Sequence, residues 1–269
     1  MTDTPVHAVF VTNQLKTAFY DALARRMHAD GTPISWISVS ERWTRYLLEQ
    51  GWPQADILSL PEFGAEWSCP LSLSDNDRAR LARIEASAEA GLKNILIMDR
   101  ELSQRPGADV ESYVSVVTRE IERFVVAQGI THGFGEPTWA PEMLTSEVLR
   151  AHGRGYYMHH LIRIPSTRIG FYEGIFHDTL VEFDKPTETH RAIARAAITG
   201  ITERGERPYY FAKNMNPQKL RRHWLDEAAH AIARRSEAKF DHSVPSLLTR
   251  SRRRFIARRR GSGAWRKTI

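Results

Sequence analysis

The chain has a single cysteine, Cys69, among its 269 residues, so it cannot form an internal disulfide. Such sparing use of cysteine is typical of proteins from a reducing compartment. Apolar runs are short as well, and none approaches the roughly 18–20 residues that a membrane-spanning helix needs. The N-terminal stretch MTDTPVHAVF lacks the basic start and apolar core of a secretory signal. We therefore expect a cytoplasmic protein that does not span a membrane.

Several motifs of common enzyme classes are missing. The first predicted strand and its turn, HAVFVTNQL, contain no glycine, and the chain has neither GxxxxGK[ST] nor GxSxG. These absences weigh against dinucleotide-dependent oxidoreductases, P-loop NTPases and α/β-hydrolases. The histidines show no HxH or HExxH spacing, and the neighbours His159 and His160 point to opposite faces of a strand. We expect neither a metal site nor a bound cofactor.

Basic residues are concentrated at the C-terminal end. Residues 250–269 contain nine lysines and arginines and no carboxylate, and the rest of the chain holds 29 basic and 32 acidic residues. With Phe255, Ile256 and Trp265 between the charges, this tail is predicted either to contact an anionic membrane surface or to be a solvated extension. Nucleic-acid binding is the weaker third option, because the body carries no zinc-finger spacing or RNP-like motif.

Alternating strand-like and helix-like patterns fill residues 5–185. Five short apolar segments are predicted strands: 7–12, 34–40, 94–99, 130–134 and 156–160. Helices are expected after the first two strands, from Ser74, from Asp109 and from Thr138 or Pro141, whereas residues 52–73 are expected to form a long connection. The order indicates an α/β fold, a Rossmann-like doubly wound and mostly parallel sheet. Helices at 187–204 and 217–237 form an expected helical extension (186–240), followed by the basic tail (241–269).

Ligands of open parallel sheets bind beyond the carboxyl ends of the strands. In the segment HGFGEPTWAPE, Glu136 and His132 supply the carboxylate and imidazole that general-base chemistry uses. Each candidate also has a purely structural interpretation: His132 as a satisfied interior residue, Glu142 as a partner of a helix dipole, and Asp99 with Arg100 as a local ion pair. The loops after the strands predict a substrate-binding set: Asn13, Lys16, Asp99, Arg100, Glu142, Arg163 and Arg168.

The order of these residues resembles a known family. The sequence is similar to the N-terminal half of bacterial capsule-polysaccharide biosynthesis proteins in three features. These are an Asp-Arg pair (Asp99-Arg100), two glutamates six residues apart (Glu136 and Glu142) and an arginine-rich segment that ends at Phe171. Those are surface-glycan glycosyltransferases of the two-domain GT-B architecture, and the similarity covers about residues 6–185. The resemblance implies transfer of a sugar from a nucleotide-sugar donor to a glycan or lipid-linked acceptor at the cytoplasmic face of the membrane. It also implies that Glu136 is the general base, assisted by His132.

One departure from that family opens an alternative. The chain ends about where a second, donor-binding Rossmann domain would begin. It is therefore expected to be the acceptor-side half of a transferase that works with a partner domain, or a non-catalytic glycan- or partner-binding domain at the membrane. Either hypothesis requires the acidic turn from Gly135 and the arginines beyond His160 to meet in one cleft.

Overall fold

The structure, a computed structural model, describes residues 5–14, 16–68, 72–99, 102–104, 107–165, 168–182 and 185–208. Six strands form one sheet in the order β3-β2-β1-β4-β5-β6. Their bounds are β1 Ala8–Val11, β2 Ile34–Ser38, β3 Ile57–Ser59, β4 His132–Gly135, β5 Gly155–Leu161 and β6 Ile169–Glu173. The first five strands run parallel, and β6 pairs antiparallel with β5. The predicted Rossmann-like, mostly parallel α/β fold is confirmed.

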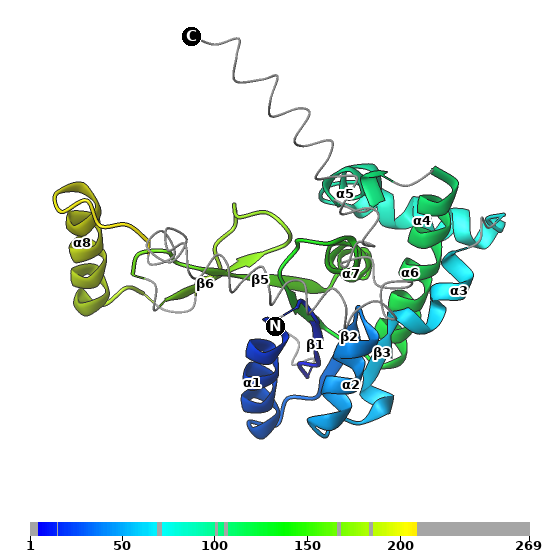
Figure 1. Cartoon of the computed structure of the whole chain (residues 1–269), viewed down its shortest axis with the longest axis horizontal. Helices are drawn as coiled ribbons and strands as arrows, with labels where there is room; N and C mark the ends of the chain where they lie inside the picture. The colour runs from blue at the N-terminus through cyan, green and yellow to red at the C-terminus, as the bar shows by residue number, and fades with distance from the viewer. Residues whose placement is uncertain are drawn as a thin grey trace, which may run out of the picture.

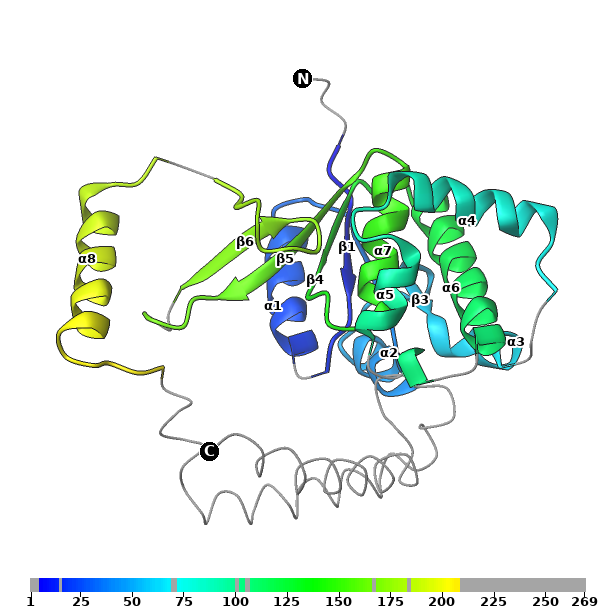
Figure 2. The ribbon, with the colours of Figure 1, turned by 90° about the horizontal axis from the view of Figure 1, so that it is seen from above.

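Helices cover both faces of the sheet (Figures 1 and 2). On one face lie α1 (Lys16–Ala29) and α2 (Glu41–Glu49), and on the other lie α4 (Asp75–Ser87), α6 (Gly107–Ala127) and α7 (Ala140–Ala151). Shorter elements connect them: η1 Gln54–Asp56, η2 Leu60–Phe63, α3 Gly64–Trp67, α5 Leu92–Met98 and η3 Leu102–Gln104. Because the central strand β1 is buried along its whole length, it reads as a continuous apolar run.

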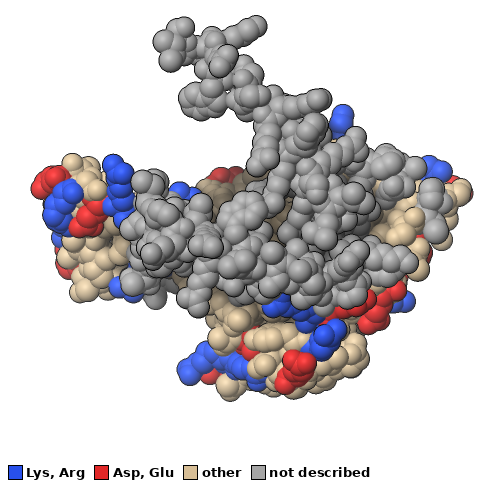
Figure 3. Space-filling view, viewed as in Figure 1, with Lys and Arg blue, Asp and Glu red and all other residues tan. Residues whose placement is uncertain are grey.

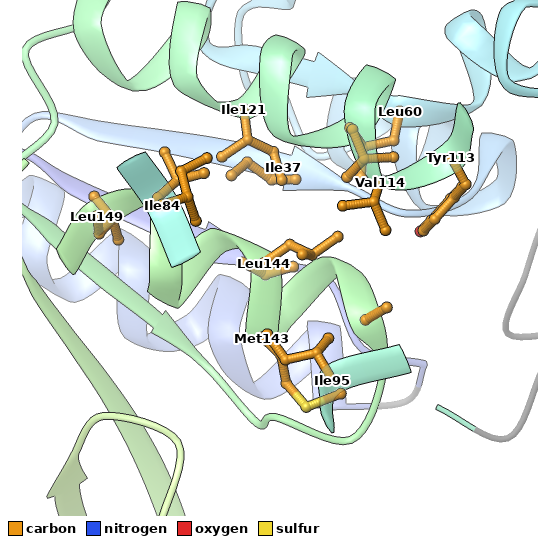
Figure 4. Close-up of a cluster of buried hydrophobic side chains, with 14 of the residues drawn as sticks. Ile37, Leu60, Ile84, Ile95, Tyr113, Val114, Ile121, Met143, Leu144 and Leu149 are labelled. Atoms are coloured by element: carbon orange, nitrogen blue, oxygen red, sulfur yellow. The ribbon is translucent and has the colours of Figure 1, made fainter. Parts of the chain in front are cut away.

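The larger core lies between the sheet and the α4–α6–α7 layer (Figure 4). Ile37 of β2, Ile84 of α4, Ile121 of α6 and Leu144 and Leu149 of α7 are all fully buried there. The apolar residues that predict α6 repeat every three or four positions, and their buried members contribute one continuous stripe to this core. Burying such side chains contributes about 1.5–3 kcal/mol each.

Two helix ends agree with the sequence signals. Ser74 caps α4, and its side chain and that of Asp77 satisfy each other's backbone N–H groups in the predicted capping box. Past the end of α6, Gly129 adopts a φ of +64°, a left-handed conformation that glycine takes without a steric penalty.

The predicted strand at 94–99 is wrong. Residues 94–98 belong to α5, which begins after Gly91 at a φ of +75°, and Asp99 is the C-cap of this helix. The run NILIMD does not lie in the sheet: Ile95 is buried, but Ile97 is 63% exposed and Met98 is 46% exposed. A short apolar run cannot by itself distinguish a helix that buries one side from a buried strand. The sheet position is taken instead by β3, inside the segment predicted to be a long connection.

From β5 onward the chain forms an arm that projects from the rest of the sheet (Figures 1 and 2). The arm consists of β5, β6 and the turns around them. The predicted loop after His160 is in fact the end of β5, a turn and the antiparallel strand β6. Helix α8 (Glu188–Thr202) follows, in agreement with the prediction for 187–204, and stands apart from the sheet in both views. Figure 3 shows acidic and basic side chains interspersed over α8, where Glu188 pairs with Arg191.

The predicted helix at 217–237 and the basic tail lie outside the described residues. Among the helices that the structure describes, none is both long and apolar enough to cross a membrane.

Candidate functional site

The sheet reverses its winding direction between β1 and β4. Strands β2 and β3 extend the sheet on one side of β1, while β4 and β5 extend it on the other. Connections that leave β1 and β4 therefore diverge, and we call the region between them, at the carboxyl ends of these two strands, the crevice. This is where ligands bind in open α/β sheets. Asn13 and Lys16 follow β1 here, and Glu136, Thr138 and Glu142 follow β4.

A buried hydrogen-bond network joins the two connections. The Nδ2 atom of Asn13 lies 2.6 Å from Oε1 of Glu142, 2.8 Å from Oγ1 of Thr138 and 3.3 Å from the carbonyl oxygen of Glu136. The other carboxylate oxygen of Glu142 accepts hydrogen bonds from the backbone N–H groups of Thr138 and Trp139, both at 2.9 Å. Glu142 thereby holds the turn in front of α7 and fixes it to the end of β1.

Burial decides the protonation of Glu142. Its side chain is fully enclosed, and loss of solvent raises its pKa from 4.5 to about 8 although four hydrogen bonds favour the charged form. An enclosed carboxyl group with every oxygen engaged is suited to positioning its neighbours. A ligand would instead contact groups that solvent can reach.

Lys16 and Glu136 form an ion pair across the crevice. Lys16 is the first residue of α1, and Glu136 is the first residue after β4. Their side chains are 41% and 28% exposed, so both are partly accessible, although Oε2 of Glu136, the oxygen that faces Lys16, is buried. Partial burial lowers the pKa of Lys16, and the nearby Glu142 acts in the opposite direction. The pair places one cationic and one acidic group next to the hydrogen-bond network of Asn13, Thr138 and Glu142.

Asp99 contacts the same end of α7 as Glu142 does. It is buried, and its carboxylate accepts hydrogen bonds from the backbone N–H of Ala140 at 2.8 Å and of Leu102 at 3.0 Å. Ala140 is the first residue of α7, so Asp99 interacts with the positive end of that helix. Arg100, its predicted partner, lies outside the described residues.

His132 does not stand beside Glu136. It is the first residue of β4 and pairs in register with Ala8 and Gly155, at the amino ends of the strands. Its Nδ1 lies 2.8 Å from Oγ1 of Thr131, and its ring stacks on Tyr157 at 5.7 Å. Partial burial lowers its pKa. The expectation that His132 and Glu136 leave the same strand end was incorrect, because the strand begins at His132 itself.

The arginines lie on the arm. Gly135 pairs with Met158, so β5 extends three residues beyond that point before Arg163 is reached. At about 3.3 Å per residue, Arg163 is more than 10 Å further along the arm than the turn containing Glu136. Both Arg163 and Arg168 are exposed in the connection between β5 and β6. The structure brings Asn13, Lys16, Glu136 and Glu142 together, but it places Arg163 and Arg168 away from them on the arm. The expected cleft shared by the acidic turn and these arginines was therefore incorrect, because β5 continues past the end of β4 and carries the arginines outward.

Sequence reasoning missed a second buried pair beside the crevice. The hydroxyl of Tyr20 on α1 and Nδ1 of His159 on β5 lie 3.1 Å apart, and both residues are buried. Desolvation, with smaller contributions from Lys16 and His160, lowers the pKa of His159 from 6.5 to about 4. The signal was available: Tyr20 lies one helical turn after Lys16, on the face of α1 that packs on the sheet.

This low pKa predicts acid sensitivity. Below pH 6.5 an unfolded chain protonates His159, whereas the folded chain keeps it neutral down to about pH 4. The free energy of unfolding should therefore fall as the pH is lowered through this window. Relative to His159→Gln, the wild type should lose about 2 kcal/mol between pH 7 and pH 5, measured by urea unfolding. An equal pH dependence in the two proteins would contradict a neutral buried imidazole.

Comparisons with known proteins do not identify a family. The chain matches no protein-family model, no curated protein and no solved structure at a significant level. Within the described ranges, no group of three or more histidine, cysteine or acidic residues could hold a metal ion. The α/β architecture and the crevice are therefore the firm basis for any functional argument.

Proposed function

We propose that the protein transfers a sugar from a nucleotide-sugar donor to a glycan or lipid-linked acceptor in surface-polysaccharide biosynthesis, as the acceptor-side half of a GT-B-type glycosyltransferase. The observation that carries this proposal is the Lys16–Glu136 pair, which is accessible and lies at the switch point of a Rossmann-like sheet. The resemblance of Glu136, Glu142 and the following arginines to capsule-polysaccharide biosynthesis proteins supports it further.

In this mechanism Glu136 is the general base. Its carboxylate accepts the proton of an acceptor hydroxyl while that oxygen forms a bond to the anomeric carbon of the donor sugar. The bond from the anomeric carbon to the diphosphate oxygen breaks, and the electron pair leaves with the nucleoside diphosphate. Lys16 stabilises negative charge in the crevice, and it releases Glu136 when an anionic group approaches. Asn13 and Glu142 keep the two connections in register, so the rate depends on orientation as well as on proton transfer.

A second candidate is a non-catalytic glycan- or partner-binding domain. Two observations favour it. Lys16 neutralises Glu136 and so weakens it as a base, and the described residues form one Rossmann-like sheet where a GT-B enzyme uses two. In this alternative the donor-binding half belongs to a partner, and a membrane contact through residues 250–269 would place the domain near its ligand.

Sugar transfer from a panel of nucleotide sugars distinguishes the two candidates. With Glu136→Gln we expect kcat to fall by about 10²–10⁴-fold, the range that general-base catalysis contributes. Glu62→Gln, an exposed carboxylate on η2, is the matched control and should leave transfer unchanged. Full activity in the Glu136 variant would remove this residue from the mechanism. Acceptor binding by calorimetry without transfer, even with a candidate partner domain added, would favour the binding domain.

A further inference from the structure

Two histidines meet on the arm, outside the network around Glu142. Nδ1 of His160 on β5 and Nε2 of His177, in the turn after β6, lie 3.0 Å apart. Their rings pack edge to face with centroids 4.6 Å apart, and the ring of Tyr172 on β6 is 5.2 Å from that of His177. Three segments of the arm thus contribute to the pair, in which His160 is half-buried and His177 is exposed.

The charged groups that act on His160 are cationic, and Asp178, which follows His177, is the acidic residue nearest to the pair in the sequence. Desolvation lowers the pKa of His160, and His177, Arg163 and Lys16 lower it further through their charges. Two imidazole nitrogens 3.0 Å apart have a spacing that a transition metal also imposes on neighbouring ligands. The cations disfavour a bound metal ion, however, because they repel it, and they favour an anion for the same reason. The described residues also add no third metal-ligating group.

Hydrogen counting shows what the pair offers to an anion. In two neutral rings, one N–H lies between the histidines, which leaves one outward donor and one outward acceptor. A bound phosphate favours uptake of one proton by the pair and so opposes the effects that lower the pKa of His160. This proton turns the outward acceptor into a second donor. The pair then presents two N–H groups of a partly charged unit, and charge-assisted hydrogen bonds of this kind are the strong ones for phosphate oxygens.

We propose that His160 and His177 form a phosphate-binding site on the arm, which takes a phosphoryl group of the substrate or acceptor beside the Lys16–Glu136 crevice. The inference rests on the proposed function for its biological setting, since nucleotide sugars and lipid-linked acceptors both carry phosphate. Lys16 connects the two places, because it pairs with Glu136 and its charge acts on His160.

The test follows the histidine ring signals by NMR while inorganic phosphate is added to the full chain. In the wild type we expect saturable shifts of the His160 and His177 signals. The affinity should fall about 10-fold or more in both His160→Gln and His177→Gln, the effect of losing one charge-assisted hydrogen bond. His28→Gln, an exposed histidine near the C-terminal end of α1, is the control and should bind as the wild type does. Unchanged affinity in both arm variants, or a response to Zn²⁺ in place of phosphate, overturns the proposal.

A second arm of the experiment identifies the source of the phosphate. Vesicles containing phosphatidic acid are compared with phosphatidylcholine vesicles by co-sedimentation. Loss of binding to phosphatidic acid in His177→Gln assigns the site to a lipid phosphomonoester, whereas a response to inorganic phosphate alone assigns it to a soluble ligand. Glu136→Gln should bind phosphate as well as the wild type. Phosphate binding without sugar transfer would therefore contradict the proposed function and support this site. Sugar transfer together with unaltered phosphate binding in the arm variants would support the proposed function and contradict this site.

Discussion

Gly135→Ala is expected to destabilise the domain by about 1–3 kcal/mol, the usual cost of overpacking a well-filled site. A Cβ atom at Gly135 would lie 2.3 Å from the hydroxyl oxygen of Tyr156, which is far closer than non-bonded atoms approach. Its next neighbours, Cζ of Tyr156 at 3.4 Å and Cβ of Val11 at 3.5 Å, are at ordinary contact distances. The clash is therefore with a single oxygen atom, and urea unfolding measures its cost.

Tyr156→Phe should restore what Gly135→Ala loses. The hydroxyl of Tyr156 is buried and has no hydrogen-bond partner among the described residues, so its removal leaves no other group unsatisfied. Alone, this substitution should leave stability unchanged or raise it by about 1 kcal/mol. In the double variant we expect a favourable coupling of about 1–3 kcal/mol.

The matched control replaces the neighbouring tyrosine. Tyr157 follows Tyr156 on β5 and points to the opposite face of the sheet, so Tyr157→Phe should give Gly135→Ala no relief. A double-mutant cycle without coupling between positions 135 and 156 would show that the turn before Glu136 is not packed on the Tyr156 hydroxyl.

Glu142→Gln should remove a large pH dependence of stability. The pKa of Glu142 is about 8 in the folded chain and about 4.5 when unfolded, so the folded state binds more protons between these values. The free energy of unfolding therefore decreases as the pH rises through this window. Relative to Glu142→Gln, the wild type should lose about 2–3 kcal/mol between pH 5 and pH 7. Unfolding in urea at a series of pH values measures this difference.

The comparison with the variant is essential, because His159 acts with the opposite sign over part of the same range. Both proteins contain His159, so its contribution cancels in the difference. Glu49→Gln, an exposed glutamate of α2, should keep the pH profile of the wild type. If Glu142→Gln also keeps that profile, Glu142 is ionised in the folded protein at neutral pH, and the Asn13–Glu142 contact is a charged one.

Much of the fold could be predicted from periodicity and capping. The α6 stripe, the Ser74 cap and the strands β1, β2, β4 and β5 each follow from a local pattern. The failures occurred where tertiary contacts decide. NILIMD has the composition of a strand, yet it forms α5, and the three residues of β3 are too few for any period. Strand β6 also escaped prediction, because its glycine and half-exposed residues carry no strong alternation.

The candidate site was predicted in part. Placing Asn13, Lys16, Glu136 and Glu142 at one sheet edge needs only the order of strands and helices and the rule for parallel sheets. The two glutamates differ in burial: Glu142 in the first turn of α7 is buried, and Glu136 before that helix is partly exposed. This difference depends on tertiary packing and could not be predicted from the sequence. The error for His132 has a simpler cause. The strand was predicted to begin at residue 130 but begins at His132, and in a strand of four residues this difference moves His132 to the amino end.

The two helices that face the crevice differ at their positive ends. The first turn of α7 is covered by Asp99 and Glu142, whereas the first turn of α1 contains no acidic residue and begins with Lys16. The N–H groups of Trp139 and Ala140 at the start of α7 thus bond to carboxyl oxygens, whereas those at the start of α1 bond to carbonyl oxygens of the preceding turn. The electrostatic asymmetry of the crevice therefore comes from α1, where the helix dipole and the charge of Lys16 have the same sign.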